Sequence, residues 1–294
     1  MVRAEESSEL ERLGRLGWRR QPHANSDAGS GSSAQRASVD YPTEGLAALG
    51  LDGGKGYWFE HRAAMVVDAL RAATAARAIW DVGAGTGAMA SRLASAGYEV
   101  VAVEPLDVGA EAVARRGDTP VFCGSLEDLE LPDTCLPIVG LFDVIEHLAE
   151  PTPLLHEVRR VLEPGGCAAV TVPAFRALWS SEDEVAGHHR RYTRRDLDAL
   201  MRSSGFDVVS SQYMFATLLV PALVLRALPY RVGMRRSPER VHANTAKQLR
   251  PDERIDAAMR RILSWERTLS RHVRLPAGLS VLGVYRIPGT RGWA

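Results

Sequence analysis

The sequence predicts an α/β protein built around a mainly parallel β-sheet. From about residue 55 onward, short apolar runs of strand length alternate with runs of helix length, which is the pattern of βαβ units. A glycine-rich turn directly follows the first apolar run, as expected where a strand leads into a helix. The length of 294 residues is sufficient for one large domain with a sizeable core.

The first half of the alternation contains two helices and two strands. Gly97 ends the second helix, because glycine disfavours a helix interior and favours a turn. The expected elements are a helix over Tyr57–Ala72, a strand over Ala78–Val82, a helix over Ala88–Ala96 and a strand over Glu99–Val103.

The second half contains three further strands and two helices. The Pro-Gly-Gly sequence at residues 164–166 closes the first helix, and Thr193 caps the second because Asp196 stands three residues later. The expected elements are a strand over Leu136–Phe142, a helix over Pro153–Leu162, a strand over Cys167–Val172, a helix from Thr193 to Gly205 and a strand over Phe206–Ser210.

The stretch from Tyr213 to about Leu275 departs from this alternation. It has helical composition and many arginines, and prolines such as Pro221, Pro229 and Pro238 divide it into pieces. A strand pattern then returns over Leu279–Ile287. The sequence therefore predicts a helical insertion in front of the last strand.

These patterns divide the chain into four parts. Residues 21–38 are rich in Ser, Gly, Ala and Asn, and they have too few apolar side chains to compensate their ordering entropy. We expect a disordered tail over residues 1–40, a core over 41–212, the helical insertion over 213–275, and the last strand of the core with the C-terminus over 276–294.

Charge and cysteine content narrow the function classes. The chain has 36 basic and 36 acidic side chains, and this balance lacks the electrostatic signature of a general nucleic-acid binder. We therefore expect no nucleic-acid partner. Its three cysteines are too few for a disulfide framework and lack metal-ligand spacing, which favours a reducing, cytoplasmic location.

No membrane span is predicted. The first 17 residues are charged throughout and contain no apolar region of a secretory signal. The longest apolar run, Met214–Leu225, is interrupted by Pro221 and is shorter than the roughly 20 residues that cross a bilayer.

The segment from Ala78 to Gly87 carries the strongest ligand signal. It reads Ala-Ile-Trp-Asp-Val-Gly-Ala-Gly-Thr-Gly, an apolar strand followed by alternating glycines. Such a loop turns tightly and approaches a ligand closely, and the free N–H groups of the next helix favour a carboxylate or phosphate. Glu104, at the end of the next strand, can accept hydrogen bonds from both ribose hydroxyls of a nucleoside.

The glycine spacing indicates which ligand this is. Dinucleotide folds prefer G-x-G-x-x-G, whereas the glycines here are Gly83, Gly85 and Gly87. Asp81, just before the loop, can pair with an ammonium group. A ligand with a nucleoside, an ammonium and a carboxylate is S-adenosylmethionine, which we expect as the cofactor.

These residues resemble the class I S-adenosylmethionine-dependent methyltransferases, of the type of the methyltransferase domain in ubiquinone biosynthesis. The resemblance extends from about Tyr57 to Phe206 and returns at the last strand. The segments that carry it are Asp81–Gly87, Glu104, Leu131–Asp133, Asp143–Leu148 and Arg160–Gly166.

The resemblance implies a Rossmann-like, doubly wound sheet of seven strands whose last strand is antiparallel. It also implies that the glycine loop holds the methionine part of the cofactor and that Glu104 holds the ribose. The cofactor-binding residues expected on this basis are Asp81, Gly83, Ala84, Gly85, Gly87, Glu104, Ser125, Leu126 and Phe142.

Two positions depart from the family pattern. Ser125 stands where the family often has an Asp near the adenine amine, although the backbone N–H of Leu126 can still serve the ring. Leu136 and Pro137 replace a Phe-Asp pair, and proline is tolerated at the start of a strand. Neither change predicts an inactive protein.

The first candidate on the acceptor side is His147, which follows the fourth strand beside Glu146. Ligands of open α/β sheets bind at this carboxyl edge. Positioning supplies much of the catalysis of methyl transfer, and a base is needed only for an acceptor that arrives protonated. A histidine suits proton abstraction from a hydroxyl. The alternative is that Glu146 and His147 only fix the loop.

The second candidate is the basic segment after the fifth strand. His188 and His189 are candidate bases, whereas Arg190, Arg191 and Tyr192 are assigned to substrate binding because arginine grips carboxylate or phosphate. The segment also resembles the Gly-His-x-Arg-Arg-Tyr pattern of a bacterial subgroup. The alternative is a solvated basic loop, and no metal site is expected because the adjacent histidines lack convincing further ligands.

The third candidate is the aromatic segment Tyr57–Arg62. Its aromatic side chains could close a lid over the cofactor, and we assign Tyr57 and Arg62 to the substrate side. The alternative is that the aromatic residues pack the first helix onto the sheet.

The helical insertion is predicted to cap the acceptor pocket. Met214–Leu225 and the arginines that follow it could rest on a membrane surface or admit a lipid-linked acceptor, the alternative being a core helix pair with exposed arginines. The sequence thus predicts a cytoplasmic methyltransferase that methylates a small-molecule, natural-product or envelope-related acceptor at oxygen. The rivals are an NAD-dependent oxidoreductase and a non-catalytic module that binds S-adenosylmethionine. The oligomeric state stays open.

Overall fold

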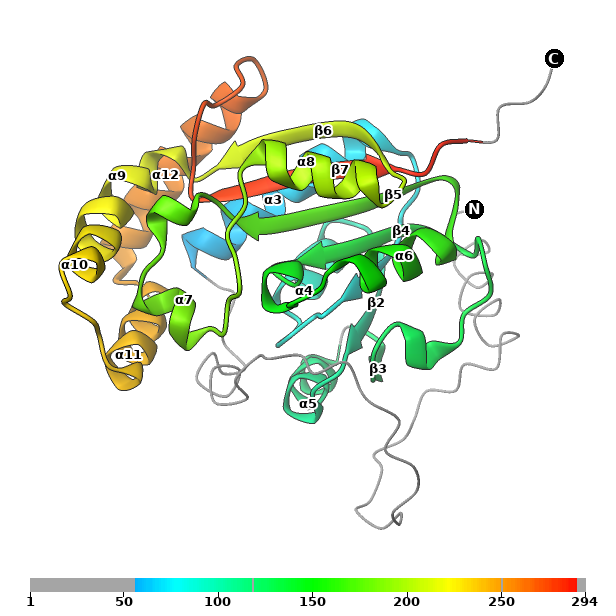
Figure 1. Cartoon of the computed structure of the whole chain (residues 1–294), viewed down its shortest axis with the longest axis horizontal. Coiled ribbons are helices and arrows are strands. Elements are labelled where there is room, and N and C mark those ends of the chain that lie inside the picture. Colours follow the sequence, from blue (N-terminus) through cyan, green and yellow to red (C-terminus); the bar gives the residue numbers. More distant parts are fainter. Residues whose placement is uncertain (1–55, 118, 250, 290–294) are drawn as a thin grey trace, which may run out of the picture.

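The computed structural model describes residues 56–117, 119–249 and 251–289. The tail predicted over residues 1–40 lies outside these residues, as does the start of the core up to residue 55. Within the described chain, seven strands form one sheet (Figure 1). The strands are β1 (Ala78–Val82), β2 (Glu99–Glu104), β3 (Val121–Cys123), β4 (Leu136–Phe142), β5 (Leu162–Pro173), β6 (Asp207–Met214) and β7 (Ser280–Arg286).

The helices connect these strands and extend beyond one end of the sheet. They are α3 (Tyr57–Ala73), α4 (Ala88–Ser95), α5 (Asp107–Arg116), α6 (Thr152–Val161), α7 (Ser181–Val185), α8 (Arg194–Ser203), α9 (Leu219–Ala222), α10 (Leu228–Arg231), α11 (Pro238–Leu249) and α12 (Glu253–Ser270), with a short π-helix over Leu223–Ala227 between α9 and α10.

The strand order is β3-β2-β1-β4-β5-β7-β6. Strands β1 to β5 pair in parallel, whereas β7 runs antiparallel to both of its neighbours, β5 and β6. The predicted seven-stranded sheet with an antiparallel last strand is therefore confirmed. The chain reverses its direction of travel across the sheet between β1 and β4, and open α/β sheets bind ligands outside the carboxyl ends of strands at such a point.

Two apolar layers hold the sheet between its helices. On one face, α3 and α4 bury side chains such as Met65, Leu70 and Leu93 against the strands. On the other face, α6 and α8 bury side chains such as Leu155 and Leu197 (Figure 1). Both faces of the parallel strands are thus covered, which explains why these strands read as continuous apolar runs in the sequence.

The helical insertion starts and ends at the carboxyl edge of the sheet. Met214, the last residue of β6, pairs with Ser280, the first residue of β7, and Pro173 at the end of β5 pairs with Ser280 from the other side. Helices α9 to α12 leave and return at this edge, so they gather with α7 beyond it (left in Figure 1). Topology alone therefore positions the insertion next to the ligand edge.

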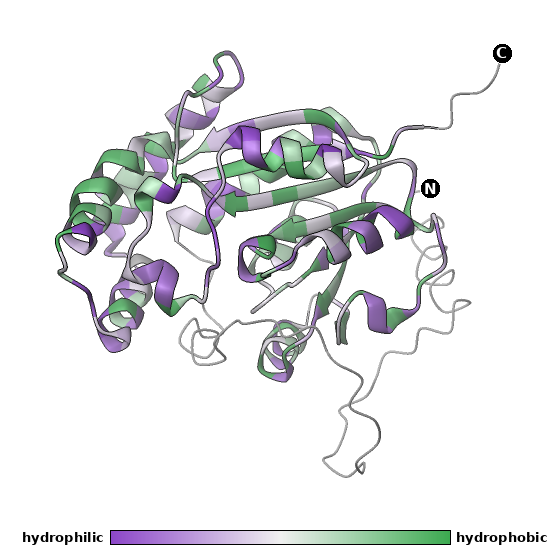
Figure 2. Ribbon diagram, viewed as in Figure 1, coloured by the Kyte–Doolittle hydropathy of each residue, from purple (hydrophilic) through white to green (hydrophobic). Residues whose placement is uncertain are grey.

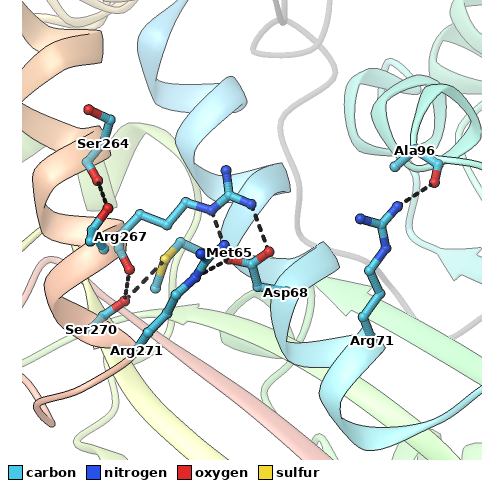
Figure 3. A network of polar contacts seen from close by, with 9 residues as sticks. Met65, Asp68, Arg71, Ala96, Ser264, Arg267, Ser270 and Arg271 are labelled. Atoms are coloured by element: carbon cyan, nitrogen blue, oxygen red, sulfur yellow. Dashed lines mark hydrogen bonds and ion pairs between the residues drawn. The ribbon is translucent and has the colours of Figure 1, made fainter.

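An ion-pair network ties α12 back to α3 (Figure 3). Asp68 of α3 accepts two hydrogen bonds from Arg267 at 2.7 and 2.8 Å, and one of 2.9 Å from Nη2 of Arg271. Ser270 adds a contact of 3.7 Å to the sulfur of Met65. The insertion is thus fixed at its end to the helix that opens the described chain.

Several element bounds differ from the sequence prediction. Strand β6 was expected to end at Ser210, but it continues to Met214 because Tyr213 and Met214 pair with β7 and are buried. The apolar run Met214–Leu225 is therefore part strand and part helix. Strand β5 begins at Leu162 rather than Cys167, with the Pro-Gly-Gly sequence forming an irregularity inside it. Helices α5 and α7 were not predicted.

Hydrophobic residues also gather outside the core. Helix α9 and the π-helix after it are strongly hydrophobic in Figure 2, and the exposed apolar side chains from α9 to α10 include Val220, Val224, Leu225 and Leu228. In the part of the chain that the structure describes, no helix has both the length and the hydropathy to cross a membrane.

Candidate active site

The glycine loop after β1 has a backbone that only glycine adopts readily. Gly83, Gly85 and Gly87 have φ angles of +74°, +58° and +75°, all in the left-handed region. A Cβ at Gly83 would lie 2.7 Å from the side chain of Val144, so this position also lacks space. The amides of Gly83 and Ala84 donate to the carbonyl of Val103 at the end of β2. The loop is therefore fixed in an arrangement that directs backbone toward the carboxyl edge.

Glu104 stands at the end of β2 and meets this loop. Its carboxylate accepts hydrogen bonds from the amides of Gly85 at 2.7 Å and Leu106 at 3.0 Å. Burial raises the pKa of Glu104, and these two hydrogen bonds offset part of the rise. Gly109 allows the approach, because a Cβ there would lie 2.7 Å from the Glu104 side chain.

Asp81 is buried directly in front of the loop. Neither of its carboxylate oxygens accepts a hydrogen bond of normal geometry from the described residues. Burial raises the pKa of Asp81 to about 7, with Arg62 and the backbone of Ala90 opposing the rise and Glu104 adding to it. A buried carboxylate with no hydrogen bond is costly, so this one is a strong candidate for a ligand contact.

The other predicted cofactor residues surround the same edge. Ser125 follows β3, and its amide and hydroxyl both donate to Asp128, at 2.8 and 2.9 Å. The side chain of Leu126 is buried in the core, and Phe142 at the end of β4 is buried next to Gly140. These contacts fix the walls of the predicted cofactor site.

Arg62 of α3 lies in an internal network under the end of β4. Its Nη1 is 2.7 Å from Asp143, and its Nη2 donates to the hydroxyl of Thr171 at 2.7 Å. The Thr171 hydroxyl in turn donates to Asp143 at 3.0 Å. Asp143 has a φ of +58°, which is uncommon for a non-glycine residue and marks the turn after β4 as strained.

Asp183 of α7 organises two of the predicted acceptor residues. Its carboxylate lies 2.8 Å from Nδ1 of His188 and accepts hydrogen bonds of 2.7 and 3.0 Å from Arg191. Burial alone would raise the pKa of Asp183, but the hydrogen bonds from His188 and Arg191 bring it below its ordinary value. Arg191 also donates to the carbonyl of Ala174, so its guanidinium has a fixed orientation.

Glu146 and His147 lie beside this group, in the turn after β4. Glu146 is fully buried, and burial followed by the charge of Asp143 raises its pKa well above its ordinary value. His147 is also buried, and its ring meets that of His188 edge-on at 4.7 Å. Burial and the neighbouring His188 lower the pKa of His147 to about 3, so its imidazole is neutral at ordinary pH.

A cavity of about 180 Å³ joins these groups to the helical insertion. Its polar lining comes from the turn after β4 and from the segment 180–191, whereas α3 and the insertion supply its other wall. The lining residues used below are Trp58, Asp143, Glu146, Asp183, His188, Arg191, Ala222 and Arg226. The predicted cap therefore does border the edge of the sheet at which the acceptor was expected.

The aromatic segment of α3 packs against the start of the insertion. Trp58 stacks on Phe215 with ring centroids 3.8 Å apart, and Glu266 of α12 accepts the Phe215 amide at 2.6 Å. Tyr57 is anchored through its amide to Asp256. Trp58 thus packs α3 against the start of the insertion and also lines the cavity. The prediction that this segment closes a lid over the cofactor stays a prediction.

Six predicted acceptor-side residues are absent from the lining of this cavity: Tyr57, Arg62, His147, His189, Arg190 and Tyr192. His189 is exposed, and its amide donates to the Glu146 carbonyl at 2.8 Å. Arg190 donates to the carbonyl of Ala149. Tyr192 is buried in the core beside β5, where burial raises the pKa of its hydroxyl.

The sequence analysis did not identify Asp183, the residue that binds both His188 and Arg191. Asp183 carries a recognisable signal, because Ser180 and Asp183 have the spacing of a capping box and form one in the structure. Arg226 and Trp58 also line the cavity, but they come from segments far apart in the sequence, so no local pattern could have paired them.

Comparison with known proteins agrees with this geometry. The methyltransferase domain family matches residues 80–170, which hold the glycine loop, Glu104 and the turn after β4. A Mycolicibacterium smegmatis protein named as an S-adenosylmethionine-dependent methyltransferase is 30% identical over 162 residues, covering 54% of this chain and 63% of the relative. A Mycobacterium tuberculosis protein named in the same way is 29% identical over 153 residues, covering 51% and 56%. The chain thus covers less than two thirds of either relative.

Solved structures share the fold at low sequence identity. A Haloferax volcanii methyltransferase in complex with the Trm112 methyltransferase activator has a TM-score of 0.55 at 17% identity, covering 85% of this chain and 100% of that one. The [4+2]-cyclase SpnF has a TM-score of 0.52 at 18% identity, covering 80% and 84%. The match over residues 80–170 identifies this part of the chain as a methyltransferase domain, and the solved structures share its fold.

Proposed function

We propose that this protein transfers a methyl group from S-adenosylmethionine to an acceptor bound in the cavity beneath the helical insertion. The observation that carries the proposal is Asp81, a buried carboxylate that accepts no hydrogen bond of normal geometry from the described residues and stands at the start of a three-glycine loop. The site fits the cofactor, because Asp81 can take its ammonium group and the N-terminus of α4, which directly follows the loop, can take its carboxylate. When bound, the cofactor supplies an activated methyl group on sulfur.

The chain's own residues would orient the two reactants. Glu104, already held by the amides of Gly85 and Leu106, offers its remaining lone pairs to a ribose. On the acceptor side, Arg191 lines the cavity with a guanidinium whose orientation is fixed by Asp183, and the N–H groups not used in these bonds can donate to a polar group of the acceptor. Positioning of this kind supplies much of the rate of an in-line displacement.

We further propose that the methylated atom is an oxygen. Asp183 contacts Nδ1 of His188 and so favours the tautomer whose Nε2 carries a lone pair. His188 lines the cavity together with Glu146, so a hydroxyl acceptor would find groups that polarise its proton. His147, with its pKa of about 3, would act only as a neutral group.

A parallel titration tests the cofactor assignment. Calorimetry of the protein with S-adenosylmethionine, S-adenosylhomocysteine and NADH should give binding of the first two and none of NADH. Binding of NADH alone would favour the oxidoreductase alternative. The fold alone does not decide the activity, since a cyclase shares it. Acceptor-dependent formation of S-adenosylhomocysteine would therefore separate turnover from mere binding of the cofactor.

We also propose that the acceptor is lipid-linked and reaches the cavity from a membrane surface. Ala222 and Arg226 line the cavity from the insertion, whereas Val220, Val224 and Leu225 of the same segment are between 50% and 66% exposed. One helical segment thus has a wall of the cavity on one side and exposed apolar side chains on another. Amphipathic segments of this kind bind the interface of a bilayer.

Vesicle sedimentation tests this route. The wild type should sediment with phosphatidylcholine–phosphatidylglycerol vesicles, and the double variant Val224→Asp/Leu225→Asp should sediment at least tenfold less. Val209→Asp is a matched control, because Val209 is an exposed apolar residue of β6 outside the insertion. Equal sedimentation of the three proteins would exclude the apolar segment as the contact.

A further inference from the structure

Three metal-ligating side chains converge at the carboxyl edge of the sheet. Glu146, His147 and His188 each offer one ligand atom, and these atoms all lie within 4.8 Å of one another. Two of the residues come from the turn after β4, and the third comes from the segment after α7. A carboxylate and two imidazoles form a ligand set that suits divalent transition metals and leaves coordination positions open.

The two histidines are oriented as metal ligands usually are. His188 uses Nδ1 toward the carboxylate of Asp183 at 2.8 Å, which leaves Nε2 as the nitrogen available to a ligand. A ring N–H of His147 donates toward the backbone of Gly187 and Ala186, which accepts. A ligating histidine normally has such a carboxylate or backbone partner on its other nitrogen, because the partner fixes the tautomer and the ring.

Glu146 supplies a separate observation that points to a ligand. Its side chain is fully buried, lines the cavity, and has no hydrogen bond of normal geometry to either carboxylate oxygen among the described residues. Buried carboxylates are ordinarily paired, hydrogen-bonded or bound to a metal. Only the backbone of Glu146 itself acts on this carboxylate as a hydrogen-bond partner among the described residues, so the carboxylate makes no hydrogen bond to another part of the loop.

The charges around Glu146 do not compensate its own negative charge, which favours a cation beside it. The two arginines whose charges act on Glu146 already have carboxylate partners, Arg62 with Asp143 and Arg191 with Asp183. Each of these pairs is neutral overall. Glu146, when ionised, is therefore the one carboxylate of the group whose charge is not matched by a paired arginine.

We propose that Glu146, His147 and His188 bind one divalent transition-metal cation. Its open coordination positions would face the cavity, where Glu146 and His188 form part of the wall. The ligand set favours Zn²⁺ or Mn²⁺ over Mg²⁺, because Mg²⁺ prefers an all-oxygen shell. The binding itself is independent of the methyltransferase activity proposed above, whereas the catalytic role of the cation rests on that activity.

In that role the cation would hold and activate the acceptor oxygen. A bound divalent cation lowers the pKa of a hydroxyl that coordinates it, so the proton leaves to solvent before transfer. The oxygen then forms its bond to the methyl carbon as the carbon–sulfur bond breaks, and the electron pair of that bond stays on sulfur. His188 would act here as a ligand rather than as a base.

Metal titration of the protein alone tests the proposal. Calorimetry should show that the chelator-treated wild type binds one equivalent of Zn²⁺. In Glu146→Gln and in His188→Ala this binding should be absent or at least tenfold weaker. His272→Ala is the matched control, since His272 is an exposed histidine outside the cluster, and it should bind as the wild type does. Mg²⁺ should bind at least tenfold more weakly than Zn²⁺.

Wild-type affinity in both cluster variants would overturn the proposal, as would the absence of a stoichiometric site in the wild type. The absorption spectrum of the Co²⁺-loaded wild type is a second measurement, and it needs no variant. A spectrum that shows no imidazole ligation of the Co²⁺ would also overturn the proposal. S-adenosylmethionine titration of each variant checks the fold and the cofactor site independently. Loss of cofactor binding in the wild type would contradict the proposed function and leave the metal result to stand by itself.

Discussion

Replacing Asp81 with asparagine should change the stability of the protein and its affinity for the cofactor in opposite directions. The buried Asp81 carboxylate accepts no hydrogen bond of normal geometry from the described residues, and burial raises its pKa from 3.8 to about 7. Asparagine has nearly the shape of the protonated acid and cannot ionise. We therefore expect Asp81→Asn to stabilise the free protein at neutral and alkaline pH while it removes the partner of the cofactor's ammonium group.

The size of this effect follows from the pKa. Because the pKa in the folded state is raised, the unfolded chain ionises at lower pH, and wild-type stability falls as pH rises from about 4 to about 7. Each pKa unit is worth about 1.4 kcal/mol, so the loss reaches about 4 kcal/mol above pH 7. The asparagine variant avoids this loss. Its advantage over the wild type should be below about 2 kcal/mol at pH 5 and about 4 kcal/mol at pH 8.

Urea unfolding of both proteins at pH 5 and pH 8, without cofactor, measures this difference. Calorimetry with S-adenosylmethionine at pH 8 supplies the second readout, in which the variant should bind at least tenfold more weakly. A stability difference that does not change with pH would refute the burial argument for Asp81. Unchanged cofactor affinity would refute its pairing with the ammonium group.

Three further substitutions test other parts of the argument. Gly85→Val should abolish S-adenosylmethionine binding in calorimetry, because Gly85 has a φ of +58°, whereas Gly97→Val strains a left-handed glycine outside the site and should retain binding. Glu104→Ala should weaken binding by about 1–3 kcal/mol, the loss of hydrogen bonds to a buried charged group, and unchanged affinity would place the ribose elsewhere. Asp68→Ala should lower the free energy of unfolding by about 1 kcal/mol, since it removes the shared partner of two partly exposed arginines, and an unaltered urea midpoint would contradict this.

The core of the fold was predictable because its signals are local. A buried parallel strand, a glycine turn and a helix start follow one another directly in the sequence, as they do from Ala78 to Ala88. Glu104 could be assigned for the same reason, since it ends the strand that pairs with β1. The bounds of β6 failed because its last residues are fixed by pairing with β7, almost 70 residues later in the chain.

The arrangement of the residues around the cavity could not be predicted from local sequence patterns. The basic segment after α7 was identified, but its members separate in space: His188 and Arg191 turn to Asp183 and the cavity, whereas His189 is exposed. Composition could not distinguish them, because the separation depends on one buried carboxylate from a short helix. The buried state of Glu146 was also invisible, since a Glu-His pair after a strand is compatible with a loop-fixing role.

The cofactor site was easier to predict than the acceptor cavity because of the order of the strands in the sheet. The glycine loop and Glu104 meet across the adjacent strands β1 and β2, so neighbouring segments of sequence suffice to bring them together. The cavity instead needs the turn after β4, the segment after β5 and an insertion that leaves at Met214 and returns at Ser280. If the acceptor binds in this cavity as proposed, a change in the insertion should alter the choice of acceptor and leave the cofactor site intact. Specificity should accordingly change with substitutions at Ala222 and Arg226, and affinity for S-adenosylmethionine should not.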